Sequence, residues 1–360
     1  MNWGEYSYIY CIILSFTFLS FISKREGKSM FILCALLMTI LVGIRDIHCG
    51  PDTWNYCEYF TKPESTTTYY ALQGVEPGFT AITRLLNIIS DNSNFYLFTM
   101  ALLTLIPIFY YIYKCSRNKM FSLFIFMTFG TATMIYFMSF YLMRQYMSMA
   151  CLSIAIVAYK KNSEHINKKT IFFILLALSM HMATILFLPL FYNNFKYINK
   201  KSILFIFIAT FILGFFVAKY LSLFQIIAIL LGKGYYMDIN AESSYQIMMT
   251  LPLFLIGLFL VLYGKKENLN TLEYRSLYCA IVFNNLFSVV YSSDRTVVYY
   301  LFPLMVLIPN VIKEARCPKF IKFMFICLFI SYYSYKYFKV IEIASLMTND
   351  SAVPYKSFLY

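Results

Sequence analysis

Charged residues are scarce in this sequence of 360 residues, at only 13% of the chain. Soluble domains carry about 25% charged residues and about 45–50% apolar ones. This chain is instead 60% hydrophobic and 20% aromatic, with a mean hydropathy of +0.65. A water-soluble fold could not bury that much apolar surface. The composition therefore excludes the soluble enzyme folds and predicts an all-α polytopic membrane protein.

The spaced ligands of a metal site are also missing. The nine cysteines include no C-x-x-C pair, there are only three histidines, and no carboxylate cluster accompanies them. We therefore expect no metal ion and no other cofactor. The net charge of +13 comes from short Lys and Arg clusters between apolar runs. The positive-inside rule explains such clusters without a nucleic acid partner.

Apolar runs of the length that a bilayer requires recur along the whole chain. They are Tyr6–Ser23, Met30–Ile44, Asn94–Tyr113, Phe121–Leu142, Arg144–Tyr159, Thr170–Tyr192, Ser202–Leu221, Gln246–Tyr263, Tyr274–Tyr291, Thr296–Ile312 and Phe320–Phe338. The first lacks a basic n-region and a cleavage site, so it predicts a retained helix. No repeat or linker divides the chain, and we expect residues 1–360 to form a single integral membrane domain.

The basic clusters set the expected topology, because cytoplasmic loops are enriched in Lys and Arg. Lys24, Arg25 and Lys28 place the first connection in the cytoplasm and the N-terminus outside. Alternation fails later unless Thr170–Tyr192 enters and returns as a re-entrant hairpin, turning near Ser179–His181, instead of crossing once. We expect about ten crossings plus this hairpin, with both termini outside.

The longest polar segment, residues 45–93, is then an extracytoplasmic loop. Within it, residues 76–90 open with Pro77, which suits the first turn of a helix. The large apolar residues of this segment fall on one face: Phe79, Ile82, Leu86 and Ile89. We expect an amphipathic helix that lies at the outer interface or caps the bundle.

Charged residues near membrane depth are costly and indicate function. Under this topology Arg45, Arg144 and Arg295 face the outer side, beside the carboxylates Asp52 and Glu76. Most of them have simpler explanations, such as a snorkelling arginine, a turn aspartate, a helix-start glutamate or a pair with the residue before Arg295. Arg144 resists such explanations because its neighbours are apolar.

Three guanidinium groups at one membrane face predict a site for an anion. Guanidinium binds phosphate through paired hydrogen bonds and stays charged in apolar surroundings. An anionic lipid head group, with a lipid-linked diphosphate as the natural candidate, would fit Arg45, Arg144 and Arg295. Asp52, Glu76 or His181 could supply a general base, the last if the hairpin forms.

The same residues occur in an order that resembles the EpsG family, from Gly43 to Phe302. The motifs are G-x-R ending at Arg45, G-x-D-T-x-x-Y-x-x-x-F from Gly50, E-P-G-F from Glu76, R-Q at Arg144, S-M-H-M-A-T around His181 and R-x-x-x-Y from Arg295. Two departures, Pro51 and Asp294, leave the charged positions untouched.

This resemblance implies a GT-C-like glycosyltransferase, an O-antigen or exopolysaccharide polymerase of the Wzy type in the bacterial inner membrane. Its donor would be a growing glycan on undecaprenyl diphosphate, and its acceptor one repeat unit on the same lipid. The units would be joined at the extracytoplasmic face, with the lipid diphosphate as leaving group. We expect a chain-length regulator protein as a further partner. Substrate contacts are assigned to Thr53, Tyr56, Gln145 and Tyr299.

Two other functions stay open at this point. A membrane acyltransferase that modifies surface polysaccharide also has many spans, but it needs a catalytic histidine on or near the acyl-carrier side. Under this topology His165 is the only cytoplasmic histidine. A flippase for lipid-linked oligosaccharides should carry charges down a central cavity and show repeat symmetry, and the sequence shows neither.

Overall fold

The computed structural model describes residues 4–22, 27–62, 65, 67–192, 199–220, 243–288, 290, 293–345 and 355–359. Every regular element in this part of the chain is a helix, and an isolated bridge pairs Arg45 with Ser357. Contacts divide the chain into two compact units. The first comprises Met1–Phe129, Met134–Leu188 and Leu328–Tyr360, and the second Gly130–Thr133 and Pro189–Cys327.

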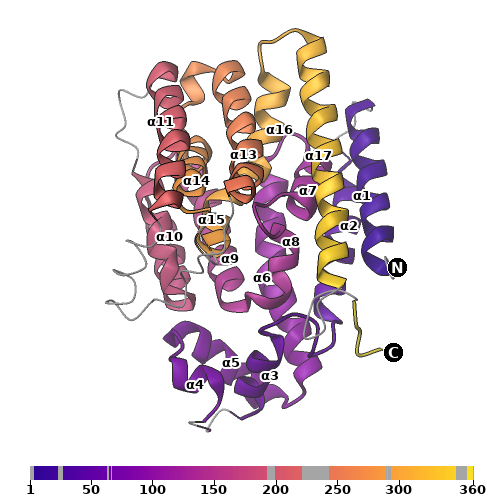
Figure 1. Cartoon of the computed structure of the whole chain (residues 1–360). Helices are drawn as coiled ribbons and strands as arrows, with labels where there is room; N and C mark the ends of the chain where they lie inside the picture. The colour runs from indigo at the N-terminus through magenta and orange to yellow at the C-terminus, as the bar shows by residue number, and fades with distance from the viewer. Residues whose placement is uncertain are drawn as a thin grey trace. The chain divides into compact units, whose positions relative to one another are not determined.

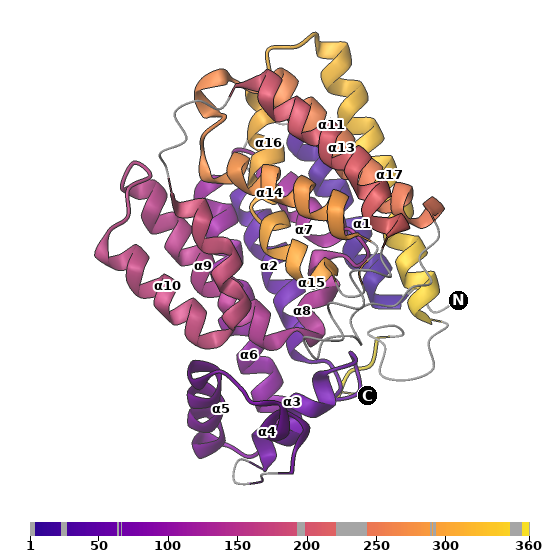
Figure 2. The same cartoon turned by 60° about the vertical axis from the view of Figure 1, so that its left-hand side comes forward.

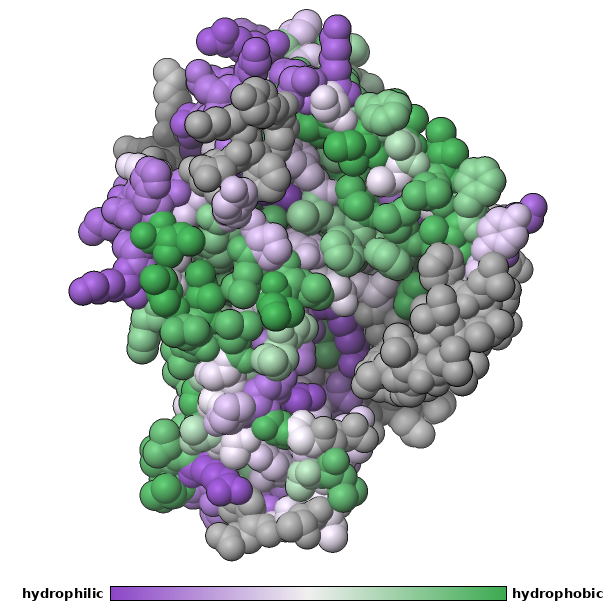
Figure 3. All heavy atoms as spheres, turned by 90° about the vertical axis from the view of Figure 1, so that its left-hand side faces the viewer, coloured by the Kyte–Doolittle hydropathy of each residue, from purple (hydrophilic) through white to green (hydrophobic). Residues whose placement is uncertain are grey.

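The first unit is built around α9, which packs against both α6 and α10 (Figure 1). Its helices are α1 (Gly4–Ile22), α2 (Lys28–Gly43), α3 (Thr53–Thr61), α4 (Tyr69–Gln73), α5 (Pro77–Ile89), α6 (Ser93–Cys115), α7 (Lys119–Thr128), α8 (Ile135–Tyr141), α9 (Met143–Lys161) and α10 (Lys168–Met180). The outer side of α10 exposes Ile171, Phe172 and Leu175, and Figure 3 shows hydrophobic side chains gathered over this face. Such a surface suits contact with lipid chains.

The second unit contains a group of helices in which α11 packs against α13 and α14. Its elements are η1 from Pro189 on (Met182–Phe191 in full), α11 (Lys200–Lys219), α13 (Ser243–Tyr263), η3 (Lys266–Asn268), α14 (Leu272–Phe287), α15 (Ser293–Leu301) and α16 (Leu304–Glu314). The last helix, α17 (Lys319–Ser345), begins in this unit and continues in the first.

Two of the predicted apolar runs are not continuous helices. The run Phe121–Leu142 was expected to be one helix, but α7 ends at Thr128 and α8 begins at Ile135. Gly130 and the threonines after it disfavour helix, and the Ile135 N–H donates to the Phe129 carbonyl at 2.9 Å across the break. The prediction of a single helix over Thr296–Ile312 is also wrong. It bends by 43° between α15 and α16, where Pro303 lacks an N–H.

Two described helices are long and apolar enough to cross a membrane, namely α6 and residues Lys200–Val217 of α11. The bent pair of α15 and α16 could form a third span, and several shorter helices are apolar as well. These helices fit a membrane protein. The expected number of crossings and the GT-C-like fold stay predictions.

The polar segment 45–93 folds into three helices, of which only α5 lies at a predicted helix position. Figure 2 shows α3, α4 and α5 grouped at one end of the helices of the first unit. The ring of Phe60 in α3 stacks on Tyr96 in α6, with centroids 4.3 Å apart. Burial of Phe79 fixes α5 in the same way. These aromatic contacts attach a polar segment firmly to the apolar helices.

The helix α10 ends at Met180 and η1 begins at Met182, so the chain breaks at His181, where the turn was predicted. His181 itself has an extended backbone, with φ −162° and ψ 119°. The break places His181 at the end of α10, next to the start of α5. Whether the segment re-enters the membrane stays a prediction.

Candidate functional site

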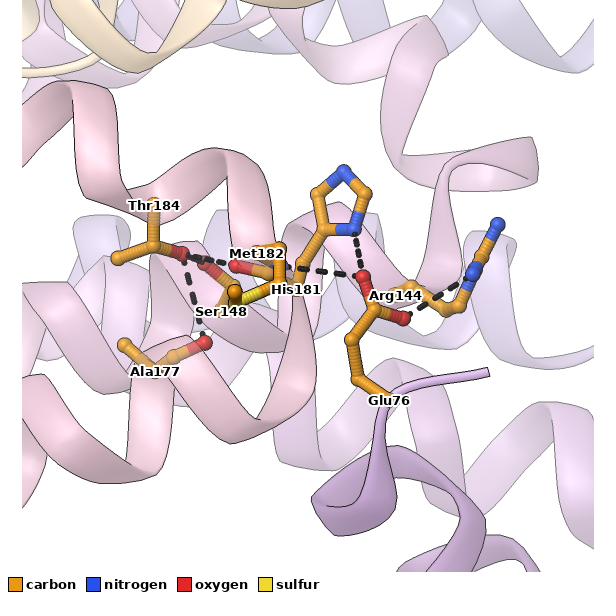
Figure 4. Close-up of polar contacts among 7 residues, drawn as sticks. All are labelled: Glu76, Arg144, Ser148, Ala177, His181, Met182 and Thr184. Carbon is orange, nitrogen blue, oxygen red and sulfur yellow. Dashed lines mark hydrogen bonds and ion pairs between the residues drawn. The ribbon is translucent and has the colours of Figure 1, made fainter. Parts of the chain in front are cut away.

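Glu76 stands directly before α5, and its carboxylate is shared by three groups (Figure 4). Its Oε2 lies 3.0 Å from Nη1 of Arg144, and its Oε1 lies 2.7 Å from Nδ1 of His181. The backbone N–H of Met182 also donates to Oε1, at 3.0 Å. One carboxylate therefore joins residues from the E-P-G-F, R-Q and S-M-H-M-A-T motifs.

A glycine makes this meeting possible. A Cβ atom at Gly78 would collide with the Ser179 side chain and would lie 2.9 Å from the Ser179 carbonyl oxygen. Only a residue without a side chain lets the start of α5 approach the end of α10 so closely. The next residue, Phe79, is fully buried and packs against Tyr56, with ring centroids 5.6 Å apart.

The surroundings of Glu76 keep it ionised. Burial alone would raise the pKa of its carboxyl group. Hydrogen bonds from His181, from the Met182 N–H and from its own N–H outweigh burial and lower the pKa to about 2. An ionised carboxylate only accepts hydrogen bonds, so Nδ1 of His181 must carry the proton between them.

That arrangement leaves the second ring nitrogen of His181 as the acceptor in the neutral imidazole. Figure 4 shows this nitrogen pointing away from Glu76. The His181 side chain is 25% exposed, and its Nε2 forms no hydrogen bond within the described part of the chain. A carboxylate-oriented imidazole with an open Nε2 can take a proton from a hydroxyl group.

Arg144 lies in the first turn of α9 with its guanidinium over the ring of Tyr70, 4.8 Å from the centroid. The hydroxyl group of Tyr56 also interacts with it, and Tyr56 stacks on Tyr70 at 4.4 Å. The Arg144 side chain is 21% exposed, and Glu76 engages only Nη1. The guanidinium therefore retains donors for a second anion. Tyr70 was not predicted, although the Tyr-Tyr pair stands out in a polar loop.

Asp52 belongs to the same cluster. It is the residue before α3, partly exposed, and its carbonyl accepts the Tyr56 N–H at 3.2 Å. Burial raises the pKa of both Tyr56 and Tyr70, and the negative charge of Asp52 adds to this effect. The Asp52 carboxylate therefore lies near the aromatic pair that contacts Arg144.

Thr53 and Gln145 are buried in the first unit. The Thr53 hydroxyl lies 3.1 Å from the Cys49 carbonyl oxygen and 3.2 Å from that of Phe140. It fixes the turn at Gly50, which needs glycine because its φ is +116°. Contact of Thr53 or Gln145 with a substrate stays a prediction.

Arg45 is 1% exposed. Its Nη1 donates to the Val42 carbonyl, and its guanidinium lies 6.0 Å from the Phe140 ring. No carboxylate in the described residues pairs with it. The last described segment, residues 355–359, covers this motif. The Asp46 N–H donates to the Lys356 carbonyl oxygen at 2.8 Å, and the Phe358 N–H donates to the Ile44 carbonyl oxygen at 3.2 Å.

Arg295 and Tyr299 belong to α15 in the second unit. Arg295 is exposed, and its backbone N–H donates to the Asp294 carboxylate at 2.9 Å. Tyr299 is fully buried. The convergence of Arg295 with Arg45 and Arg144 stays a prediction.

Two supporting residues, Ser148 and Thr184, were not predicted. The Thr184 hydroxyl donates to the His181 carbonyl at 2.6 Å and is hydrogen-bonded to Ser148 (Figure 4). Both side chains are fully buried. Ser148 lies one turn after Arg144 on α9, so one helix carries the arginine and anchors the histidine turn. The sequence features that could have identified them are the four-residue spacing of Ser148 from Arg144 and the position of Thr184 at the end of the S-M-H-M-A-T motif.

Comparison with known proteins agrees with the motif order. The EpsG family matches residues 28–357, which is nearly the whole chain. Neither a curated protein nor a solved structure matches this chain. The matched range contains Glu76, Arg144 and His181 together with all the other motif residues described above. This chain belongs to the EpsG family.

Proposed function

We propose that this protein is a polysaccharide polymerase that joins undecaprenyl-diphosphate-linked repeat units at the extracytoplasmic face of the bacterial inner membrane. The observation that supports this function best is the shared carboxylate of Glu76, which holds an imidazole and a guanidinium together. An imidazole can accept a proton, and a guanidinium can stabilise a leaving diphosphate. Glycosyl transfer from a lipid diphosphate can use both.

In the proposed reaction, the hydroxyl group of the acceptor sugar attacks the anomeric carbon of the donor sugar. The bond from that carbon to the lipid diphosphate breaks, and the diphosphate leaves with the electron pair. The hydroxyl proton passes to Nε2 of His181. Glu76 holds Nδ1 and stabilises the imidazolium that forms. Asp52 stays a candidate for binding sugar hydroxyls or for assisting this base.

The charge that develops on the diphosphate is assigned to arginine. Arg144 is the first candidate, because it is partly exposed and Glu76 occupies only one of its nitrogens. Arg295 is exposed in its own unit and is the second. Arg45 is buried beneath residues 355–359, so it could reach a diphosphate only if that segment moved.

The proposal is tested with purified protein in lipid nanodiscs and a synthetic undecaprenyl-diphosphate repeat unit, followed by separation of the products on a gel. We expect wild-type protein to yield a ladder and His181→Ala to yield only the single repeat. His165→Ala is the matched control, because His165 is exposed in the connection between α9 and α10. A normal ladder from His181→Ala would contradict the assignment of the base.

A gel of surface glycan from cells without the gene tests the function itself. Collapse of the ladder to a single repeat unit supports a polymerase. Loss of the single repeat as well would support a flippase. An unchanged ladder whose sugars lack acyl groups would support the acyltransferase.

A further inference from the structure

His48 and Trp54 form a stacked aromatic pair on the surface of the first unit, outside the cluster around Glu76. Their ring centroids are 5.1 Å apart and their planes differ by 10°. Trp54 is 44% exposed and His48 is also exposed. We call this pair the aromatic platform.

The backbone beneath the aromatic platform is well fixed. The His48 N–H donates to the Asp46 carboxylate at 2.9 Å, and the Cys49 N–H donates to the Asp46 carbonyl at 3.0 Å. The Thr53 N–H then donates to the Gly50 carbonyl at 3.1 Å, at the start of α3. Because the turn is ordered, the two rings are presented in a preorganised position.

The chemistry of the aromatic platform matches a sugar ring. The face of an indole carries negative potential, and the C–H groups on one face of a pyranose carry partial positive charge. Carboxylates beside such a ring accept hydrogen bonds from sugar hydroxyl groups. Asp46 and Asp52 stand on either side of the turn in sequence, and both are partly exposed.

An exposed tryptophan in a membrane protein can instead anchor the chain at the bilayer interface. Two observations favour a sugar. Trp54 stacks on a polar imidazole, and the neighbouring carboxylates Asp46 and Asp52 would be repelled by anionic head groups. Trp54 and Tyr56, whose hydroxyl interacts with Arg144, belong to the same helix α3, with the Trp54 ring on its exposed side and the Tyr56 ring on its buried side.

We propose that the aromatic platform is a binding subsite for a pyranose ring of the glycan, at the start of the helix α3 that also carries Tyr56. This inference rests on the proposed function, because it takes the glycan that the protein would polymerise as the ligand. Its role would be to bind the saccharide part of a substrate whose diphosphate lies at Arg144. The residue that stacks would be Trp54, with His48 supporting it from one side.

The chain offers a direct optical test, because it contains only two tryptophans. A Trp3→Phe variant leaves Trp54 as the sole indole. In lipid nanodiscs it is titrated with lipid-free oligosaccharide released by mild acid from the strain's own surface polymer. We expect a saturable change in emission, and His48→Ala should weaken the apparent affinity several-fold. No saturable change would overturn the proposal.

Nanodiscs made with lipids brominated on their acyl chains test the alternative. Strong quenching of Trp54 by these lipids, without an effect of oligosaccharide, would make the platform a bilayer anchor and the proposal wrong. In the polymerisation assay, Trp54→Ala should raise KM several-fold with little change in kcat, and Trp54→Phe should recover much of the loss.

The same titration separates the two proposals. The His181→Ala variant should bind oligosaccharide normally while making no polymer. Normal binding together with normal polymer from His181→Ala would retain the subsite and reject the proposed base. If polymer formation depends on His181 but the emission of Trp54 does not respond to oligosaccharide, the subsite alone is rejected.

Discussion

Arg45 and Arg144 carry the same charge within the first unit, but their surroundings are opposite. The Arg144 side chain is 21% exposed, faces the Glu76 carboxylate at 3.0 Å and lies over an aromatic ring. Arg45 is 1% exposed and donates to a backbone carbonyl, and no carboxylate in the described residues pairs with it. Burial lowers the pKa of Arg45, because a charged group loses hydration there.

This contrast separates a partly accessible guanidinium from a buried one. A partly exposed guanidinium that is paired through one nitrogen can add a phosphate partner with little rearrangement. A buried guanidinium held by backbone can meet a ligand only after the covering segment moves, and its own desolvation is already a cost to stability. Two arginines that are equivalent in the sequence should therefore respond differently to substitution.

The largest expected effect is at Arg144. Arg144→Ala should lower kcat for polymerisation by about 10²–10³-fold, as for the loss of one preorganised donor to a developing negative charge. The kcat of Arg144→Lys should lie between those of wild type and Arg144→Ala, because lysine keeps the charge without the planar pair of donors. Arg84→Ala serves as control, since Arg84 is exposed on α5. Activity of Arg144→Ala within twofold of wild type would remove the distinction between the two arginines.

Arg45 should show its effect first in stability. Arg45→Ala should destabilise the protein by about 2–5 kcal/mol, the range for truncating a long buried side chain. Arg45→Met fills similar space without charge and should melt near the wild-type temperature, as with other buried charges replaced by apolar residues. Melting in detergent and polymer yield are measured together. A stable Arg45→Met variant without activity would instead make Arg45 a diphosphate ligand.

Glu76, the partner of Arg144, makes the stability of the fold depend on pH. Its pKa of about 2 in the folded protein lies below its ordinary value of 4.5. The ionised carboxylate therefore stabilises the fold above pH 4.5, and this stabilisation is lost as the pH falls toward 2. The difference corresponds to roughly 3 kcal/mol. Melting temperatures between pH 5 and 2.5 should fall less steeply for Glu76→Gln than for wild type; parallel slopes would contradict the assignment.

The sequence named Glu76, Arg144 and His181 among its candidates, because charged residues beside apolar runs are costly unless they are used. It did not pair them. The pairing depends on the close approach of Gly78 to Ser179, and on Thr184 holding the turn of His181. Such contacts arise only when distant helices pack, so the choice among three candidate bases stayed open.

The sequence also failed to predict where two of the apolar helices break. Hydropathy averaged over a run does not register one glycine or one proline, so the breaks at Gly130 and Pro303 were missed. The helices α3 and α4 were missed because their segment is polar. Their stability comes from aromatic contacts with other elements, such as Phe60 on Tyr96. Local sequence does not contain those partners.

The smallest predicted effect concerns the segment that covers Arg45. The Tyr355 hydroxyl donates to the Leu41 carbonyl at 2.7 Å, just before the G-x-R motif. Tyr355→Phe removes this hydrogen bond and should cost about 0.5–1.5 kcal/mol. Hydrogen exchange at the Asp46 amide, which donates to the Lys356 carbonyl oxygen, should accelerate. The exchange rate of the Tyr56 amide in α3 should be unchanged. Equal acceleration at both amides would mean that the segment supports the whole loop, and that burial of Arg45 is not its specific role.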